Sequence, residues 1–241
     1  MSHERTALDH HHPLISYTRR SGATFLVDKP LRWTSFDVVK KLRTTWGVKK
    51  IGHAGTLDPL ATGLLIVCAG LHTKSIRQYQ DMDKVYRGEM VLGKTTPSVD
   101  LETDFDSEVS CSHVAPKDLQ ELVPAFVGAI EQVPPAHSAV KRNGTRSYKR
   151  ARRGLEVSLE PRCVTVHHFV LTTVDLPRVA FEVACSKGTY IRSLVRDFGQ
   201  RLGVGAHLAS LRRTQIGPFR LQDAYAMDML AKMPPEPPII T

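Results

Sequence analysis

The stretch GHAGTLDPLATGLL, residues Gly52 to Leu65, decides how the chain folds around its most informative side chain. It runs into Leu64–Ala69, a continuous apolar segment that predicts a central strand buried on both faces. The small residues that flank Asp58-Pro59 are Gly52, Ala54, Gly55 and Ala61. They would let the backbone of another molecule approach closely. We therefore expect an acidic side chain on a loop at the rim of a rigid sheet, where functional sites are commonly built.

The pair Asp58-Pro59 also has a purely structural interpretation. Aspartate at a helix N-cap, followed by proline at the first helical position, is a common way to begin a helix. This alternative is favoured for an isolated Asp-Pro pair. The small residues around it and the buried strand after it shift the balance towards a functional loop.

Secondary structure can be predicted on both sides of this stretch. Upstream, Thr24–Asp28 predicts a short strand, and Thr34 predicts a helix N-cap with Asp37 at the third helical position. Downstream, a second strand is predicted at about Val85 to Leu92. The clearest helix is Tyr190–Leu202, because its apolar side chains recur with the helical period.

The remaining segments alternate irregularly between helix and strand. Gly93–His113 is polar and acidic, which predicts a long surface loop, and Ala115–Val127 predicts a helix kinked at Pro124. Arg162–Val174 and Val179–Cys185 predict two strands joined by a turn. There is no βαβ rhythm, so the pattern favours an α+β fold with a largely antiparallel sheet.

The charge of the chain favours a polyanionic partner. The 241 residues carry a formal net charge of +9, and residues 141–153, KRNGTRSYKRARR, contain seven basic side chains and no acid. A solvated helix face would normally intersperse glutamates. Net charge alone fits a basic surface equally well, but this clustering favours binding to nucleic acid.

Cysteine and histidine placement predicts neither a disulfide nor a metal site. Cys68, Cys163 and Cys185 lie in apolar or alternating segments, and no CxxC pair occurs, which indicates reduced, buried thiols. His167 and His168 are neighbours in a predicted strand and should point to opposite faces. No apolar run is long enough to span a bilayer and no signal-peptide pattern is present, so we expect a cytoplasmic protein.

Several ordered blocks, from about Gly22 to Ala226, resemble the TruB family of bacterial tRNA pseudouridine synthases. The central block follows the family outline GHxGTLDPxATGxL. The others are LVDKP (Leu26–Pro30), DKVYRGEMVLG (Asp83–Gly93), PPAHSAVKRNGTRSYKRAR (Pro134–Arg152), CSKGTYIRSLVRDFG (Cys185–Gly199) and AHLASLRRTQIGPF (Ala206–Phe219).

This resemblance implies a pseudouridine synthase fold, a mixed, mainly antiparallel sheet flanked by helices and loops. It also implies the reaction of the family, isomerisation of the T-loop uridine at position 55 of tRNA. The N1–C1′ bond breaks, the uracil turns over, and C5 bonds to C1′. Because the product is an isomer, no cofactor is implied. The family's catalytic aspartate falls on Asp58, and a carboxylate can attack a sugar or base carbon or deprotonate the sugar to a glycal. Which route it follows is left open.

The resemblance also assigns the other catalytic groups. The arginine that pairs with the catalytic aspartate, and so keeps it ionised, falls on Arg192. The alternative for Arg192 is an ordinary surface charge, which its position after Ile191 in the first helical turn weakens. Tyr190 matches a tyrosine that contacts the uracil and is a candidate for handling the C5 proton.

Four further residues match positions that bind the flipped nucleotide or support the site. Tyr86 corresponds to the stacking tyrosine, His53 to the histidine that fills the gap left by the base, and Leu211 to an apolar wall. Lys29 lies in a turn near the site. Without the resemblance, core packing would be the better interpretation of Tyr86 and Leu211, and a loop residue without a role that of His53.

The basic segment corresponds to the RNA-facing side of the family, which implies phosphate contacts from Lys141, Arg146 and Lys149. We expect a mobile polar leader at 1–22, one catalytic domain at 23–232 and a proline-rich tail at 233–241, without the PUA module that many relatives carry. The expected partner is the T-arm of tRNA. A guide RNA, a membrane, a metal and a second copy of the chain are not expected.

Two other functions stay open. One is an RNA-binding module that uses the same cleft without turnover. The other is a dyskerin-like enzyme that needs a guide RNA and partner proteins, which the compact chain argues against.

Overall fold

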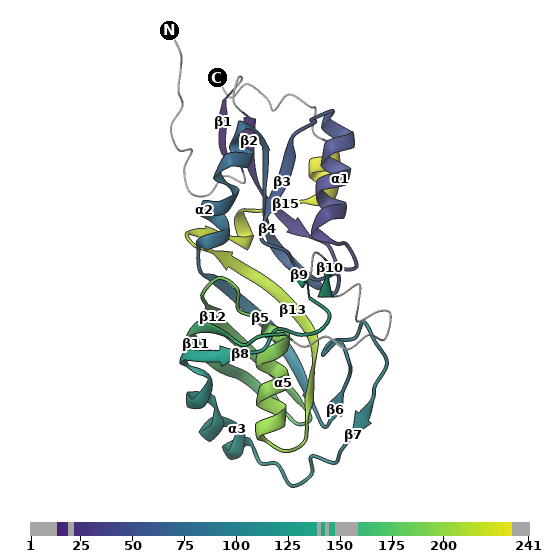
Figure 1. The fold of residues 1–241 in the computed structure, drawn as a ribbon, viewed down its shortest axis with the longest axis vertical. Helices are drawn as coiled ribbons and strands as arrows, with labels where there is room; N and C mark the ends of the chain where they lie inside the picture. Colours follow the sequence, from purple (N-terminus) through teal and green to yellow (C-terminus); the bar gives the residue numbers. More distant parts are fainter. Residues whose placement is uncertain (1–13, 19–21, 139–140, 143–144, 148–158, 233–241) are drawn as a thin grey trace. The chain divides into compact units, whose positions relative to one another are not determined.

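The computed structural model describes residues 14–18, 22–138, 141–142, 145–147 and 159–232. The chain divides into two compact units, which are described separately: Met1–Val85 with Arg212–Thr241, and Tyr86–Leu211. Strands β5 (Lys84–Leu92) and β13 (Ala206–Ile216) have residues in both units. The expected α+β class is confirmed, since sheet strands and covering helices occur in both units (Figure 1).

The first unit is built around β4 (Ala61–Gly70). It pairs antiparallel with β2 (Gly22–Lys29) and with the short β3 (Ile51–Ala54), and it neighbours β13. Strand β1 (Leu14–Thr18) extends the sheet beyond β2. The small strands β14 and β15 are Phe219–Arg220, which pairs with β13, and Tyr225–Ala226, which lies parallel to β2.

The alternation of side chains along β4 creates two apolar clusters, one on each face. Leu65, Val67 and Ala69 join a cluster with residues of α1 (Ser35–Trp46) and α6 (Met227–Lys232). Leu64, Ile66 and Cys68 belong to the other cluster, which residues of α2 (Ile76–Asp81) partly cover. The predicted strand with two buried faces is therefore confirmed, as is the Thr34 N-cap, whose capping box with Asp37 is complete.

The second unit contains the strand order β13-β5-β12-β11-β8. Strands β12 (Arg178–Cys185) and β11 (Arg162–Asp175) form the predicted hairpin, and β8 (Gly128–Gln132) pairs with β11. Helix α5 (Ile191–Arg201) confirms the clearest predicted helix, and Phe126, Phe169, Phe181 and Phe198 form a chain of ring contacts. Two-stranded pairs join β6 (Lys94–Thr95) to β7 (Ser107–Glu108) and β9 (Lys141–Arg142) to β10 (Thr145–Arg146).

Some sequence predictions need correction. Residues 93–113 are not simply a surface loop, because Thr96, Ser98 and Asp100 are buried there. The helix predicted at Ala115–Val127 is α3 (Pro116–Leu122), after which the backbone tightens into a 3-10 turn, η2 (Val123–Phe126), that contains the predicted kink residue. Two further 3-10 turns, η1 (Leu71–Ser75) and η3 (Leu221–Asp223), lie in the first unit.

Three side-chain predictions on β11 are wrong. Cys163 is exposed rather than buried, although Cys68 and Cys185 are buried and none of the four cysteines forms a disulfide. His167 and His168 are both exposed, because the register with β12 shifts between Val166 and His168 and the strict alternation of sides is lost.

At the N-terminus, Leu14–Thr18 is strand β1 inside the segment predicted as a mobile leader. The predicted tail from Met233 lies outside the described residues. Across the residues that the structure describes, no helix is long and apolar enough to span a membrane.

Candidate active site

Asp58 lies on the loop between β3 and β4, where it is half-buried. Its carbonyl oxygen accepts a hydrogen bond from the backbone N–H of Ala61 over 3.1 Å, which closes a tight turn directly before β4. No helix follows Pro59, so the N-cap interpretation of Asp58-Pro59 is wrong. The turn directs the chain into the central strand β4 and places the carboxylate next to the start of that strand.

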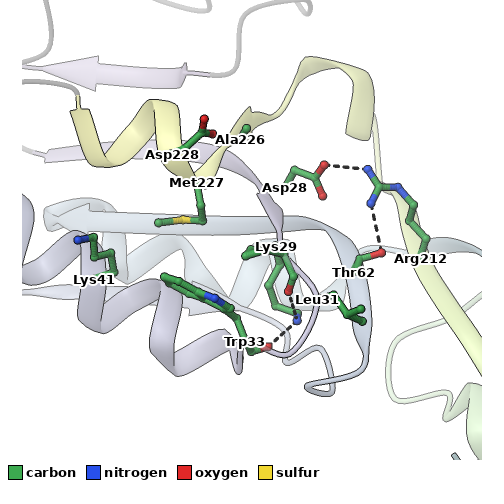
Figure 2. Close-up of a pocket in the computed structure, with 11 residues that line it drawn as sticks. Asp28, Lys29, Leu31, Trp33, Lys41, Thr62, Arg212, Ala226, Met227 and Asp228 are labelled. Carbon is green, nitrogen blue, oxygen red and sulfur yellow. Dashed lines mark hydrogen bonds and ion pairs between the residues drawn. The ribbon is translucent and has the colours of Figure 1, made fainter. Parts of the chain in front are cut away.

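Lys29 anchors this turn from the end of β2. Its side chain is fully buried, and Nζ donates to the carbonyl oxygens of Pro30 at 3.0 Å and Trp33 at 2.5 Å (Figure 2). It also donates to the carbonyl oxygen of Pro59 at 3.4 Å. Burial lowers the pKa of Lys29 to about 8, while the negative charge of Asp58 acts in the opposite direction. Lys29 therefore joins the Asp58 loop to the turn that follows β2.

A second buried contact fixes the loop to the start of α1. The hydroxyl of Ser35 accepts from the N–H of Leu57 over 2.8 Å and lies 3.2 Å from the carbonyl oxygen of the same residue. Leu57 immediately precedes Asp58, so both sides of the aspartate are tied to the region that begins at Lys29.

Arg213 holds the opposite side of the loop, and the sequence analysis did not single it out. Its side chain is buried, and its Nε donates to the carbonyl oxygen of Leu64 over 2.7 Å, while Nη2 donates to that of Gly55 over 3.3 Å. Gly63 has a φ of +100°, and a Cβ there would lie 2.3 Å from the carbonyl oxygen of Arg213. The glycine is thus required for β4 and β13 to approach at this point.

His53 lies on β3, close enough to Arg213 for their charges to interact. Burial is the main reason that the pKa of His53 is lowered, and the positive charge of Arg213 lowers it further. The Nδ1 atom is buried and has no hydrogen-bond partner in the structure. The neutral imidazole is therefore the favoured form around neutral pH.

In the second unit, Tyr190 is the N-cap residue of α5. The side chain of Gln132 makes two hydrogen bonds to its backbone: Oε1 accepts from the Tyr190 N–H over 2.7 Å, and Nε2 donates to the Tyr190 carbonyl over 3.0 Å. Gln132 is itself buried at the end of β8. This pairing, which the sequence analysis missed, fixes where the helix begins and hence where the phenol side chain leaves the backbone.

Arg192 follows in the first turn of α5 and is buried, so its interpretation as an ordinary surface charge is wrong. Nη1 donates to the carbonyl oxygen of Ser98 over 2.9 Å, and Nη2 donates to that of His137 over 2.8 Å. The carboxylate of Asp100 lies 3.7 Å from Nε. Asp100 and Ser98 come from the segment predicted as a surface loop, and they are buried because they surround this guanidinium.

Tyr86 and Leu211 lie on β5 and β13, and each is about 9% exposed. Gly88 makes room for this part of the sheet, since a Cβ there would lie 2.7 Å from Phe181 and 3.2 Å from Leu211. Both residues are mostly buried, as the core interpretation requires, so their roles towards substrate stay predictions.

The predicted phosphate contacts fall where little is described. Lys149 lies outside the described residues, and for Lys141 and Arg146 only the strands β9 and β10 are described. Over the described part of the chain, no group of three or more His, Cys, Asp or Glu side chains is arranged to hold a metal ion.

The sequence of this chain matches two models of one protein family. Residues 43–191 match the TruB family pseudouridylate synthase (N terminal domain), and residues 192–234 match the tRNA pseudouridylate synthase B C-terminal domain. The chain belongs to the TruB family. All of the predicted site residues from His53 to Tyr190 lie in the first matched region, and Arg192 and Leu211 lie in the second.

Curated relatives are similar in sequence to this chain over most of their own length. The protein of Flavobacterium johnsoniae named tRNA pseudouridine synthase B is 47% identical over 84% of this chain and 92% of its own. Its namesake in Phocaeicola vulgatus is 45% identical, over 87% of this chain and 92% of its own. The namesake in Syntrophotalea carbinolica is 42% identical, over 88% of this chain and 69% of its own.

Solved structures support the fold. A Cbf5-Nop10-Gar1 complex contains a chain with a TM-score of 0.68 and 30% identity, matched over 88% of this chain and 54% of that one. An H/ACA RNP bound to a substrate RNA containing 2′-deoxyuridine gives a TM-score of 0.65 and 27% identity. This chain spans about half the length of those two chains.

Proposed function

We propose that this protein is a tRNA pseudouridine synthase that isomerises the T-loop uridine at position 55, with Asp58 as the catalytic carboxylate. The observation that carries the proposal is the fixed position of Asp58. It stands in the family motif on a loop held by Lys29 at Pro59 and by Arg213 at Gly55. A loop secured on both sides can present a carboxylate in one orientation, which positional catalysis requires.

The reaction needs no atoms beyond those of the substrate. The N1–C1′ bond of uridine breaks, the uracil rotates, a C5–C1′ bond forms, and the C5 proton leaves to water while N1 gains a proton. Asp58 acts as an anion, either by attack on the sugar or base or by removing a sugar proton to give a glycal. Tyr190 contacts the uracil and is the candidate to handle the C5 proton.

The remaining roles follow from the family motif. Arg192 is the cation proposed to pair with Asp58 and keep it ionised. Tyr86 stacks on the everted base, His53 fills the gap that the base leaves, and Leu211 forms an apolar wall. Lys29 supports the catalytic loop, a role that its three carbonyl contacts favour.

The chain should recognise tRNA without other molecules. Its net charge of +9 supports binding of the T-arm, and Lys141, Arg146 and Lys149 are proposed to contact phosphates. We further propose that the protein acts as a monomer in the cytoplasm and needs no guide RNA. RNA shape and everted bases, rather than base-pair reading, would give its specificity.

Tritium release from tRNA transcripts labelled at C5 of uridine tests the proposal directly. The protein should release tritium over many turnovers without metal or nucleotide, and a transcript with cytidine at position 55 should release none. Asp58→Asn should abolish release, whereas the control Asp104→Asn, which changes an exposed carboxylate, should not.

The competing functions give different results. An RNA-binding module would bind tRNA and release no tritium even as the unmutated protein. A dyskerin-like enzyme would be active only with guide RNA and partner proteins. Full activity of Asp58→Asn would overturn the catalytic assignment itself.

A further inference from the structure

A second surface of the first unit has the features of a binding site, and none of the residues assigned above except Lys29 lies on it. The turn between β2 and α1 carries Trp33, which borders two adjoining pockets of about 530 and 420 Å³. Lys41 of α1 also borders both. The two pockets therefore share one indole and one ammonium group in their linings, and Figure 2 shows these two side chains in the larger pocket.

The indole of Trp33 is held in place before any ligand arrives. It is half-buried and packs against the apolar cluster beneath α1. The backbone carbonyl oxygen of Trp33 accepts the hydrogen bond from Lys29. The capping box of Thr34 and Asp37 then fixes the chain immediately after it. Figure 2 shows the side chain of Met227, from α6, extending towards the indole from the other side of the larger pocket. Met227 is buried in the cluster that Trp33 packs against, so the part of the indole that stays exposed is the surface on which a flat ring could stack.

The smaller pocket is cationic. Arg32, Lys40 and Lys41 line it, all exposed, and within the described part of the chain none of them forms an ion pair. The acid among its lining residues, Asp37, accepts from the backbone N–H and the hydroxyl of Thr34 at 2.8 and 2.6 Å. In the larger pocket, Asp28 is likewise engaged by Arg212 over 2.7 Å. The exposed Asp228 also lines the larger pocket, whereas the smaller pocket sets three cations against the single carboxylate of Asp37. The smaller pocket therefore carries a net positive charge, so a ligand with phosphate groups fits it.

Arg32 adds an independent indication. Its φ of 65° places it in the left-handed region, which is unfavourable for a residue with a side chain. Its N–H donates to the carbonyl oxygen of Pro59 over 2.8 Å, so the strained turn is fixed against the Asp58 loop. Glycine would adopt this backbone without strain. Strained residues concentrate at functional sites, and here the strain presents an exposed guanidinium beside Trp33.

We propose that this surface binds an unpaired nucleotide of the RNA substrate, with the base stacked on Trp33 and the neighbouring phosphates held by Arg32, Lys40 and Lys41. The inference rests on the proposed function, because it takes RNA to be the substrate. Stacking on an aromatic side chain beside a row of cations is how proteins bind single-stranded RNA without reading its sequence. The catalytic carboxylate would then be connected to this contact through Arg32 and Pro59.

Tryptophan fluorescence can test the stacking, since the chain has two tryptophans and Trp46 is buried against Phe25. Trp46→Phe leaves Trp33 as the reporter. Titration of Trp46→Phe with an unmodified tRNA transcript and with a short single-stranded oligoribonucleotide should quench its emission in both cases. The fluorescence of Trp33→Leu should stay unchanged, and its Kd for tRNA should rise about tenfold. Quenching by the transcript alone would also support the site, whereas unquenched emission of Trp46→Phe at saturating tRNA would overturn it.

A charge variant separates RNA contact from packing, because it leaves the core untouched. Lys40→Gln combined with Lys41→Gln should raise KM for tRNA about tenfold, leave kcat within about twofold, and lower the salt dependence of binding. Lys74→Gln, which removes an exposed charge on η1, should change neither. Equal KM in the double variant and the unmutated protein would overturn the phosphate contacts. Absence of tritium release by the unmutated protein would instead refute the proposed function, while the fluorescence titration would still report on Trp33.

Discussion

The guanidinium of Arg213 donates to the carbonyl oxygen of Leu64 over 2.7 Å, and this hydrogen bond joins a buried cation to the strand that follows the Asp58 loop. The same side chain donates to the carbonyl oxygen of Gly55, the first residue of that loop. Arg213 thus contacts the segment that carries Asp58 on both sides of that residue. Two backbone carbonyl groups of this segment thus accept hydrogen bonds from one charged side chain.

Replacement of Arg213 should therefore destabilise the protein. We expect Arg213→Met to lower the free energy of unfolding by about 2 kcal/mol, because the carbonyl oxygens of Gly55 and Leu64 each lose a hydrogen bond from a charged group. Arg212→Met is the matched control, since Arg212 forms a partly exposed ion pair with Asp28 and should cost less than about 1 kcal/mol. Urea unfolding measures both. Equal losses in the two variants would mean that Arg213 does not hold the loop.

The pKa of His53 should depend on the charge of Arg213. Because burial and Arg213 lower its pKa below the ordinary 6.5, the neutral ring is favoured in the fold. The stabilisation that comes from keeping His53 neutral is fully present above its ordinary pKa. It is lost as the pH falls through the lowered pKa of the folded protein. Arg213→Gln should raise the pKa of His53, and Arg212→Gln should leave it unchanged. NMR spectra of the imidazole, assigned with His53→Gln, measure the midpoint. A midpoint that is the same with and without Arg213 would contradict the interaction.

The strand at β4 could be predicted from sequence because its apolar run is unbroken. Each side chain from Leu64 to Ala69 enters one of two clusters on opposite faces, which no amphipathic helix would allow. The helix at Thr34 was predictable for a similar reason, since the capping box needs only residues that are neighbours in sequence.

The residues that position the site were harder to predict. Arg212 and Arg213 are identical neighbours on β13, and only the pairing with β4 decides that Arg213 is buried and Arg212 faces outward. Gln132 contacts Tyr190 from 58 residues away. Such contacts leave no local pattern in the sequence.

Burial of the polar segment after β5 was missed because composition does not reveal local hydrogen bonds. The hydroxyls of Thr96 and Ser98 both donate to the carbonyl oxygen of Asp100, at 2.6 and 3.1 Å. Polar groups satisfied in this way can be buried at little cost, and the segment can then surround Arg192.

Lys29 should make stability depend on pH in the alkaline range. Its pKa is about 8 in the fold and 10.5 in the unfolded chain, so the unfolded chain binds more protons between these values. The unmutated protein should therefore gain stability relative to Lys29→Met as the pH rises from about 8 to 10.5, by up to about 3 kcal/mol. Below pH 8 the difference should be constant. Urea unfolding of both proteins across this range measures it, and other titrating groups cancel in the comparison. A difference that does not change with pH would show that the ammonium is not desolvated.

Gln132 should control activity through Tyr190. Gln132→Met keeps the volume of the side chain but removes both hydrogen bonds to the Tyr190 backbone, so the start of α5 loses its fixed position. Tyr190 is proposed to contact the uracil, and small displacements of a group at a reaction centre are costly. We therefore expect kcat to fall about tenfold while the Kd for tRNA stays within about twofold. The exposed Gln120 of α3 offers the matched control Gln120→Met, which should change neither constant. Single-turnover tritium release gives the rate, and filter binding gives the Kd. An unchanged rate in Gln132→Met would mean that the phenol of Tyr190 needs no positioning, and a parallel loss of tRNA binding would mean that Gln132 serves the stability of the second unit instead.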